Sequence, residues 1–254
     1  MLRPRVIPCL LLRNKGLVKS VKFRNHVYIG DPINTVRIFN EKEVDELIIL
    51  DTMATLEKRK PSFELIKNIV SESFMPIAYG GGIRTVEDAR TIISLGVEKI
   101  ILNAAAIEMP LIVKELSDAI GSQSVVVSID VKKSWLKGYQ TYTSCGKVPT
   151  GIDPVKHAIK MQEMGAGELM INSIDRDGTF QGYDIGLISL ISNAVAIPVI
   201  ACGGAANLGH LRNALIEGGA SAAAAGSLFV FHGKHKAVLI NYPSNDQILQ
   251  LIAS

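Results

Sequence analysis

A single carboxylate stands at the end of a run of residues that should form a buried strand. Asp130 closes SVVVSID (124–130), whose other residues are apolar apart from two serines. Because a carboxylate is costly to remove from water, a group in such a place has a charged partner or a chemical task. Lys132 is one possible partner. We predict instead that Asp130 is catalytic, as a general base, or binds the substrate, and Asp51, at the end of LIILD, carries a weaker form of the same argument.

Two glycine-rich turns are the second chemical signal. GGG (80–82) and GG (203–204) each follow an apolar run, and each is followed further on by a second turn of small residues. Glycine lets the backbone approach a ligand closely, and N–H groups at the start of a helix attract phosphate. Tight turns without a ligand are the alternative, but two paired turns favour two phosphate sites. The predicted binding residues are Gly81, Gly82, Asn103, Gly203, Gly204, Gly226 and Ser227.

The motif NSIDRDGT (172–179) adds further polar groups after another apolar run. Its carboxylates could act as acids or bases, hold a hydroxyl group, or only cap a turn. We predict that Asp177 and Gly178 contribute to the second phosphate site. We expect Lys15 and Lys19 in a long loop after the first strand. They could reach phosphates or could be ordinary solvated charges, and we include Lys19 among the predicted binding residues.

Short apolar runs alternate with amphipathic stretches, as in a parallel sheet that is buried on both faces. The predicted strands are Arg5–Leu11, Glu46–Asp51, Ile77–Tyr79, Lys99–Asn103, Ser124–Asp130, Glu168–Ser173, Val199–Cys202 and Ala222–Ala225. The predicted helices are Pro32–Val44, Ser62–Ser73, Thr85–Leu95, Pro110–Ile120, Asp153–Met164, Asp184–Asn193 and Asn207–Glu217. The last helix lies in FHGKHKAVLI (231–240) or NDQILQLIA (245–253). This order predicts one α/β domain, residues 1–254, folded as a (βα)8 TIM barrel.

An internal repeat supports the barrel and divides it into half-barrels of about residues 1–120 and 121–254. DELIIL (45–50) matches GELMIN (167–172), and PIAYGGG (76–82) matches PVIACGG (198–204), both with an offset of 122 residues. ILNAAA (101–106) and AAAGSL (223–228) show the same offset. The first strands differ by 119 residues, which makes Leu11 the counterpart of Asp130.

Four charged residues stand near the starts of predicted strands, at the end of the barrel opposite Asp130. Arg5, Glu46, Lys99 and Glu168 come from strands one, two, four and six. Solvated loop charges are the usual interpretation of such residues. Because their signs alternate, a ring of ion pairs that closes the bottom of the barrel is also possible.

Composition excludes several classes of protein. The net charge of +3 is too small to indicate nucleic acid or a membrane surface, and no apolar stretch reaches transmembrane length without interruption. The apolar run near the N-terminus ends at Arg13 without a cleavage site, so we expect a strand there rather than a signal peptide. Cys9, Cys145 and Cys202 are too scattered for a disulfide framework and fit a reducing cytoplasm. The five histidines show no metal spacing, and we expect neither a metal nor a cofactor.

The segment VKKSWLKGYQTYTSCGK (131–147) follows strand five and has the pattern of an inserted β-hairpin. It carries Trp135, Tyr139 and Tyr142. Such an insert would lean over the mouth of the barrel as a lid or contact a partner.

These features together resemble one family along nearly the whole chain, the cyclase subunit of imidazole glycerol phosphate synthase. The matching stretches are GDP (30–32), DELIILD (45–51), EKRK (57–60), GGGI (80–83), GSQSVVVSID (121–130), TGI (150–152), SIDRDGT (173–179) and GGA (203–205). The resemblance implies a barrel docked on a glutaminase subunit as a heterodimer. Ammonia released there would pass through the barrel, gated by Arg5, Glu46, Lys99 and Glu168, to a phosphorylated substrate at the far mouth, where Asp130 is one of two catalytic aspartates.

The sequence departs from the family at the other catalytic position, which is Leu11 here. Ala104 and Met53 are further departures near the mouth. Three hypotheses follow. The chain is a diverged paralogue that supplies ammonia for amidating a sugar in surface polysaccharide synthesis, with a nucleotide-sugar substrate and a third enzyme as possible partners. Alternatively, it is a working cyclase of histidine biosynthesis in which another group replaces the lost acid, or it is a scaffold that only activates a glutaminase.

Overall fold

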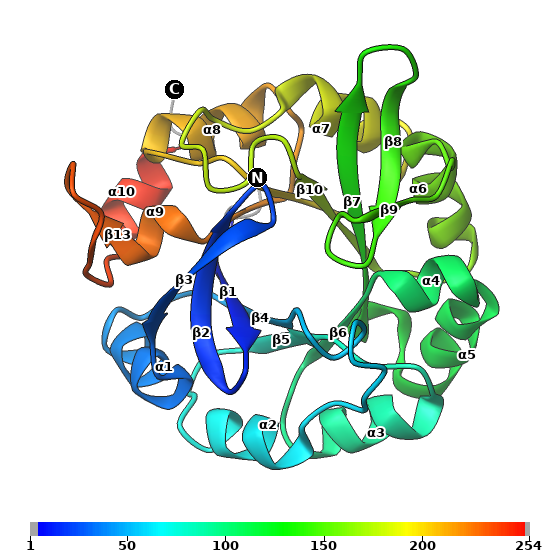
Figure 1. Ribbon diagram of the computed structural model, residues 1–254, viewed down its shortest axis with the longest axis horizontal. Helices are drawn as coiled ribbons and strands as arrows, with labels where there is room; N and C mark the ends of the chain where they lie inside the picture. The colour runs from blue at the N-terminus through cyan, green and yellow to red at the C-terminus, as the bar shows by residue number, and fades with distance from the viewer. Residues whose placement is uncertain (1–4, 252–254) are drawn as a thin grey trace.

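The computed structural model describes residues 5–251, whose central feature is a closed barrel of eight parallel strands. Around the barrel the strands follow the order β1-β4-β5-β6-β7-β10-β11-β12, and pairing of β12 with β1 closes the circle. Figure 1 shows helices in a ring outside these strands, which confirms the predicted (βα)8 barrel. The barrel strands are β1 (Arg5–Arg13), β4 (Leu47–Asp51), β5 (Ile77–Gly80), β6 (Lys99–Leu102), β7 (Val125–Ser134), β10 (Glu168–Ser173), β11 (Val199–Cys202) and β12 (Ala222–Ala225).

Side-chain caps fix where most of the helices begin. In α1, α3, α6, α7, α8 and α10 a Ser, Thr, Asp or Asn side chain accepts a hydrogen bond from a backbone N–H three residues further on. The helices are α1 (Pro32–Glu41), α2 (Phe63–Val70), α3 (Val86–Ser94), α4 (Ala104–Glu108), α5 (Leu111–Ile120), α6 (Pro154–Glu163), α7 (Ile185–Ser192), α8 (Leu208–Ile216), α9 (Ser227–Val230) and α10 (Asn245–Gln250). Within the described range no helix is long and apolar enough to cross a membrane.

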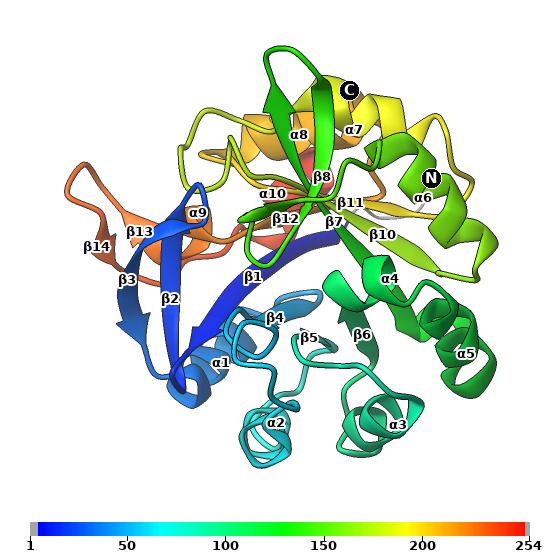
Figure 2. The same cartoon turned by 45° about the vertical axis from the view of Figure 1, so that its right-hand side comes forward.

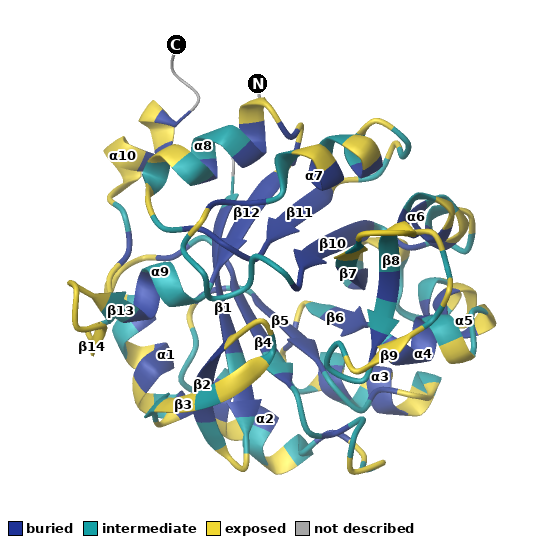
Figure 3. Cartoon of the chain, turned by 45° about the horizontal axis from the view of Figure 1, so that its top comes forward, coloured by how far each residue is buried: buried dark blue, intermediate teal, exposed yellow. Residues whose placement is uncertain are grey.

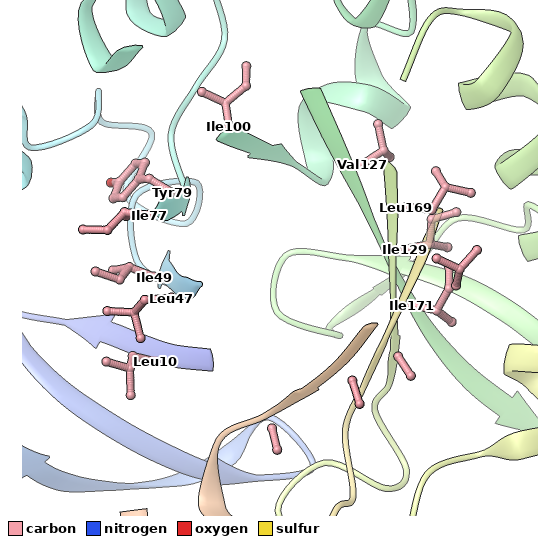
Figure 4. Packing of buried hydrophobic residues seen from close by; sticks show 14 of the residues in the cluster. Leu10, Leu47, Ile49, Ile77, Tyr79, Ile100, Val127, Ile129, Leu169 and Ile171 are labelled. Atoms are coloured by element: carbon pink, nitrogen blue, oxygen red, sulfur yellow. The ribbon is translucent and has the colours of Figure 1, made fainter. Parts of the chain in front are cut away.

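The larger apolar core lies between the strands and the surrounding helices. Figure 4 shows Leu10, Leu47, Ile49, Ile77 and Tyr79 from three neighbouring strands packed side by side in this layer. Each fully buried side chain of this size contributes roughly 1.5–3 kcal/mol through removal from water. A second, smaller cluster, which includes Ile7 and Met170, fills the barrel itself, because alternate residues of each strand point inward.

Two hairpins rise from the barrel at the carboxyl ends of the strands. The segment after β1 was expected to be a long loop, and this expectation is wrong: it forms β2 (Gly16–Val21) and β3 (Arg24–Gly30), which place Lys15 in a turn and Lys19 on a strand. β3 is largely exposed, so it lacks the apolar pattern that marks a strand (Figure 3).

The hairpin predicted after the fifth barrel strand is present. β7 continues beyond Asp130 and pairs with β8 (Gly138–Thr143), which pairs with the short β9 (Val148–Pro149). In Figure 2 the β7–β8 hairpin stands away from the barrel, and its tip residue Trp135 is 96% exposed.

The C-terminal segment resolves the choice between two candidate last helices. In the first candidate segment, residues 231–238 form a hairpin of β13 (Phe231–His232) and β14 (Ala237–Val238). The last helix is α10, which lies in the second candidate segment, 245–253. Residues 252 and 253 of that segment lie outside the described range. The extent of the domain, 1–254, and its half-barrel boundaries remain predictions. Tyr242 ties this segment to the barrel, because its buried hydroxyl donates a hydrogen bond to Val6 O at 2.7 Å.

Replacing Tyr242 by Phe removes this hydroxyl and leaves a buried carbonyl without that donor. We expect Tyr242→Phe to lower the free energy of unfolding by about 1 kcal/mol, measured by urea denaturation. Tyr28→Phe is the control, since Tyr28 is 66% exposed, and we expect no measurable change. Equal stabilities of the Tyr242→Phe variant and the unaltered chain would contradict the assigned role.

Candidate functional site

Two adjoining cavities open at the carboxyl ends of the barrel strands, and all twelve residues predicted to bind or react line one of them. The first cavity has a volume of about 130 Å³ and holds Asp51, Gly81, Gly82, Asn103 and Asp130. The second, of about 40 Å³, holds Lys19, Asp177, Gly178, Gly203, Gly204, Gly226 and Ser227. This is the end at which (βα)8 barrels build their sites. The roles assigned to these residues stay predictions.

Among the carboxyl groups of the site, Asp130 has the most perturbed pKa. Its side chain is buried, and burial together with the nearby negative charge of Asp177 raises its pKa to about 7, against an opposing hydrogen bond with Ser128. The alternative of an ion pair with Lys132 is not found among residues 5–251, and that ammonium lies 6.0 Å from the centre of the Tyr142 ring. A carboxyl group with this pKa can both take up and release a proton near neutral pH.

Asp51, by contrast, is engaged by its own loop. Its carboxylate pairs with Arg59 at 2.9 Å and accepts hydrogen bonds from the N–H groups of Met53 and Ala54 at 3.1 and 3.2 Å. These contacts hold the loop after β4 against the first cavity. Asn103, at the end of β6, donates to Ser128 O at 3.0 Å and so links two neighbouring strands beneath the cavity.

The second cavity contains a buried lysine. Lys19 reaches inward from β2, and its ammonium donates a hydrogen bond to the carbonyl of Cys9. Gly226 lies directly against that ammonium, so a Cβ at this position would collide with it. Burial lowers the pKa of Lys19, since desolvation disfavours the charged form. An anion in this cavity would meet a cation and the backbone of two glycine turns.

Asp177 holds the β2–β3 hairpin over the second cavity. Its carboxylate accepts hydrogen bonds from the Ser20 hydroxyl at 2.9 Å and from the Phe23 N–H at 3.4 Å, and its carbonyl accepts one from the Lys22 N–H at 2.9 Å. Gly178 is pressed against Ser20 O, which leaves no room for a side chain. Asp175 is not in either cavity and accepts a hydrogen bond from the Lys133 N–H at 2.8 Å.

Four side chains line both cavities where they meet, and sequence reasoning assigned none of them to binding. They are Leu11, Phe23, Leu50 and Asn172. Asn172 shares the inward face of β10 with Glu168 and Met170, and this alternation is the signal in the sequence that could have identified it. Cys9 and Cys202, judged scattered in the sequence, also meet here, and hydrogen bonding between their thiols helps to raise the pKa of Cys202 well above its ordinary value.

The ring of ion pairs at the opposite end of the barrel is present. Arg5 pairs with Glu46 at 2.6 Å and also with Glu168, while Lys99 pairs with Glu46 at 3.2 Å and with Glu168 at 3.0 Å. Both glutamates are buried. Two positive and two negative charges therefore form a closed neutral ring across the barrel floor, whose role as a gate stays a prediction.

No group of three or more His, Cys, Asp and Glu side chains in residues 5–251 is placed to hold a metal ion. The described acids of the site instead contact backbone N–H groups, a serine or an arginine. The residues available to a ligand are thus a titrating acid, a buried lysine and two sets of glycine turns.

Fold and site together define a (βα)8 barrel with a polar double cavity at the carboxyl ends of its strands. The family described as "Histidine biosynthesis protein" matches residues 5–236. The chain belongs to this family.

Three relatives are similar to the chain over nearly their full lengths, and each carries a provisional name as an imidazole glycerol phosphate synthase subunit. The protein named hisF2 of Pseudomonas aeruginosa is 50% identical over 248 residues, covering 98% of this chain and 99% of the relative. The HisF protein of Leptospira interrogans is 48% identical, covering 97% of each chain. The hisF3 protein of Vibrio vulnificus is 47% identical, covering 96% and 94%.

The raised pKa of Asp130 makes stability depend on pH. Because its pKa rises from 3.8 to about 7 on folding, the folded protein keeps a proton that the unfolded chain has released, and stability falls as pH rises through this range. Asp130→Asn removes this penalty. We expect the variant to be more stable than the unaltered chain by up to about 4 kcal/mol at pH 8 in urea denaturation, with the difference vanishing near pH 4.

Asp118→Asn is the control for this measurement, since Asp118 is exposed and, among residues 5–251, forms an ion pair only with Lys114. We expect it to change stability by less than about 0.5 kcal/mol at either pH. An Asp130→Asn variant that is no more stable at pH 8 than the unaltered chain would show that the acid is ionised there without penalty.

The ion-pair ring makes a separate prediction for stability. Arg5→Met leaves Glu46 and Glu168 buried with one cation between them, and we expect a loss of about 3 kcal/mol in the free energy of unfolding. Arg37→Met is the control, because it breaks the exposed pair with Glu72 and should change the stability far less. Similar losses in the two variants would mean that the ring behaves as ordinary surface charge.

Proposed function

We propose that the chain is the barrel subunit of a two-subunit glutamine amidotransferase and that it passes ammonia to an acceptor other than the histidine-pathway substrate. A glutaminase subunit would dock on the face that carries the ion-pair ring and would release ammonia there. The acceptor is a sugar, amidated by a third enzyme in surface polysaccharide synthesis, with a nucleotide-sugar or another phosphorylated molecule in the double cavity.

The main observation behind this proposal is the leucine at position 11. It lies where the two cavities meet, at the position where the resembling family has a catalytic aspartate, and it lines both cavities. A leucine exchanges no proton, so an acid–base mechanism that needs two carboxylates has only Asp130 left. Leu50 and Phe23 make the same place still more apolar.

The barrel interior supports a route for a small neutral molecule. Between the ion-pair ring and the cavities, the inward-facing residues are mostly aliphatic, and several are only alanines, including Ala78, Ala222 and Ala224. Ammonia in its neutral form is tolerated in such surroundings, whereas an unpaired ion is not. The ring would have to open for entry, which is the gating role inferred from the resemblance.

A working cyclase is the second candidate, and the state of Asp130 favours it. This acid has a pKa of about 7, as a group that transfers protons at neutral pH requires, and both cavities keep their glycine turns. In this case another group would replace the acid missing at Leu11.

Complementation separates the two candidates. The gene is expressed, together with the glutaminase subunit of its own organism, in a histidine auxotroph that lacks its cyclase subunit. We expect no growth without histidine, because ring closure requires the second acid. The purified chain should nevertheless increase the activity of that glutaminase, which shows that it is folded and forms the complex.

Growth that is restored by the chain and lost with Asp130→Asn would overturn the proposal in favour of the cyclase. The scaffold hypothesis is tested on the amidated product instead. It requires the product yield to be unchanged by Asp130→Asn, and a clear loss of product would reject it.

A further inference from the structure

The carboxamide oxygen of Asn172 has no hydrogen-bond partner among the described residues, although the side chain is only 6% exposed. Leaving a buried acceptor unsatisfied costs about 1–3 kcal/mol, so natural proteins rarely keep one without a reason. Among the described residues three other buried side-chain atoms also lack a hydrogen-bond partner, but of the four residues concerned Asn172 alone lines the cavities.

The fold fixes where this oxygen lies. Asn172 follows Glu168 and Met170 on the inward face of β10, and it is level with Asp130 on β7 and with Cys202 on β11. Gly203 leaves room beside the oxygen, because a Cβ there would come within 2.8 Å of it. The carboxamide is therefore the polar group that stands directly above Met170 at the top of the apolar interior.

No described donor forms a hydrogen bond with the oxygen of Asn172. Asp130 offers a carboxylate, Leu11 and Leu50 offer hydrocarbon, and the ammonium of Lys19 donates to the carbonyl of Cys9 instead. A ligand that forms a hydrogen bond with the oxygen of Asn172 must therefore supply an N–H or O–H donor. It must also be small if it arrives through the interior of the barrel.

We propose that the carboxamide oxygen of Asn172 and the carboxylate of Asp130 form a binding site for ammonia, held as the ammonium ion. This inference rests on the proposed function, in which ammonia passes through the barrel. Neutral ammonia takes the proton of the Asp130 carboxyl group, which gives an ammonium ion and a carboxylate with no other reactant. The ion then donates to both oxygens. When neutral ammonia leaves for the acceptor, the proton returns to the Asp130 carboxylate, which restores the carboxyl group.

The other charged and titratable groups that face Asp130 come from three elements. Asp177 after β10 adds a negative charge, Cys9 lies on β1, and Cys145 stands in the turn before β9. Burial raises the pKa of the Cys145 thiol to about 11, so it stays protonated and competes for no proton. An ammonium ion would therefore meet negative or neutral neighbours.

The experiment follows the titration of the Asp130 carboxyl carbon by NMR in the full chain, assigned with Asp130→Asn. Spectra are recorded in ammonium chloride and in sodium chloride at the same ionic strength. An ion that binds only the carboxylate form lowers its apparent pKa, by about one unit when ammonium is tenfold above its dissociation constant. We expect this shift in ammonium chloride, and we expect Asn172→Leu to lose most of it.

Thr141→Val is the matched control. The hydroxyl of Thr141 is also buried and without a partner among the described residues, but Thr141 lines neither cavity, so the shift should persist. Asn172→Ala serves as a second variant if the leucine variant does not fold. An equal shift in Asn172→Leu or Asn172→Ala and the unaltered chain, or no shift in any of them, would overturn the proposal.

Potassium chloride distinguishes ammonium from a general cation site, and an equal shift with potassium would also overturn the proposal. The measurement uses neither a glutaminase nor a sugar. A negative result with intact amidation in cells would reject the Asn172 site and leave the proposed function standing. A pKa shift that depends on Asn172, combined with growth of the histidine auxotroph, would support the Asn172 site and reject the proposed function.

Discussion

The strict alternation of inward and outward side chains in a closed parallel barrel is the constraint on which the rest of this structure depends. On β10 the inward residues are Glu168, Met170 and Asn172, which are charged, apolar and polar in that order. β1 likewise presents Arg5, then apolar and thiol groups, then Leu11. A shift of one residue in any strand would turn its members of the ion-pair ring or of the cavities outward. Pairing of β12 with β1 and of β7 with β10 closes the barrel and prevents such a shift.

The same alternation gives the two ends of the barrel different chemistry. The floor is a neutral ring in which each charge has two partners, so its side chains are fixed by one another. The mouth keeps charges that are not paired in this way: Asp130 has no ion-pair partner in the described part of the chain, and the ammonium of Lys19 donates to a carbonyl. Fixed geometry at the floor and titrating groups at the mouth are the physical basis for the proposal that ammonia enters at the floor and that the chemistry takes place at the mouth.

The fold and most of the candidate site could be predicted because short stretches of sequence determine both. Runs that are apolar throughout mark strands buried on both faces, and glycine pairs mark the turns after them. A shared position near the starts of strands relates Arg5 to the later charges of the ring. The β2–β3 hairpin could not be found in this way, because it is held by Asp177, 157 residues away from Ser20, and its strand β3 is exposed. Asn172 looked like the start of a turn motif, and only strand register reveals that it faces inward. The Cys9–Cys202 contact likewise joins strands from opposite ends of the chain.

The strand β7 runs without interruption from Val125 inside the barrel, past Asp130, to Ser134 beneath the hairpin tip. Five cross-strand pairs with β8 hold the part from Asp130 to Ser134, and the Lys133 N–H donates a hydrogen bond to Asp175. One continuous piece of backbone therefore joins Asp130, at the base of this two-stranded ribbon, to Trp135 at its tip. As Trp135 is the only tryptophan in the chain, its fluorescence reports on contacts made at the tip.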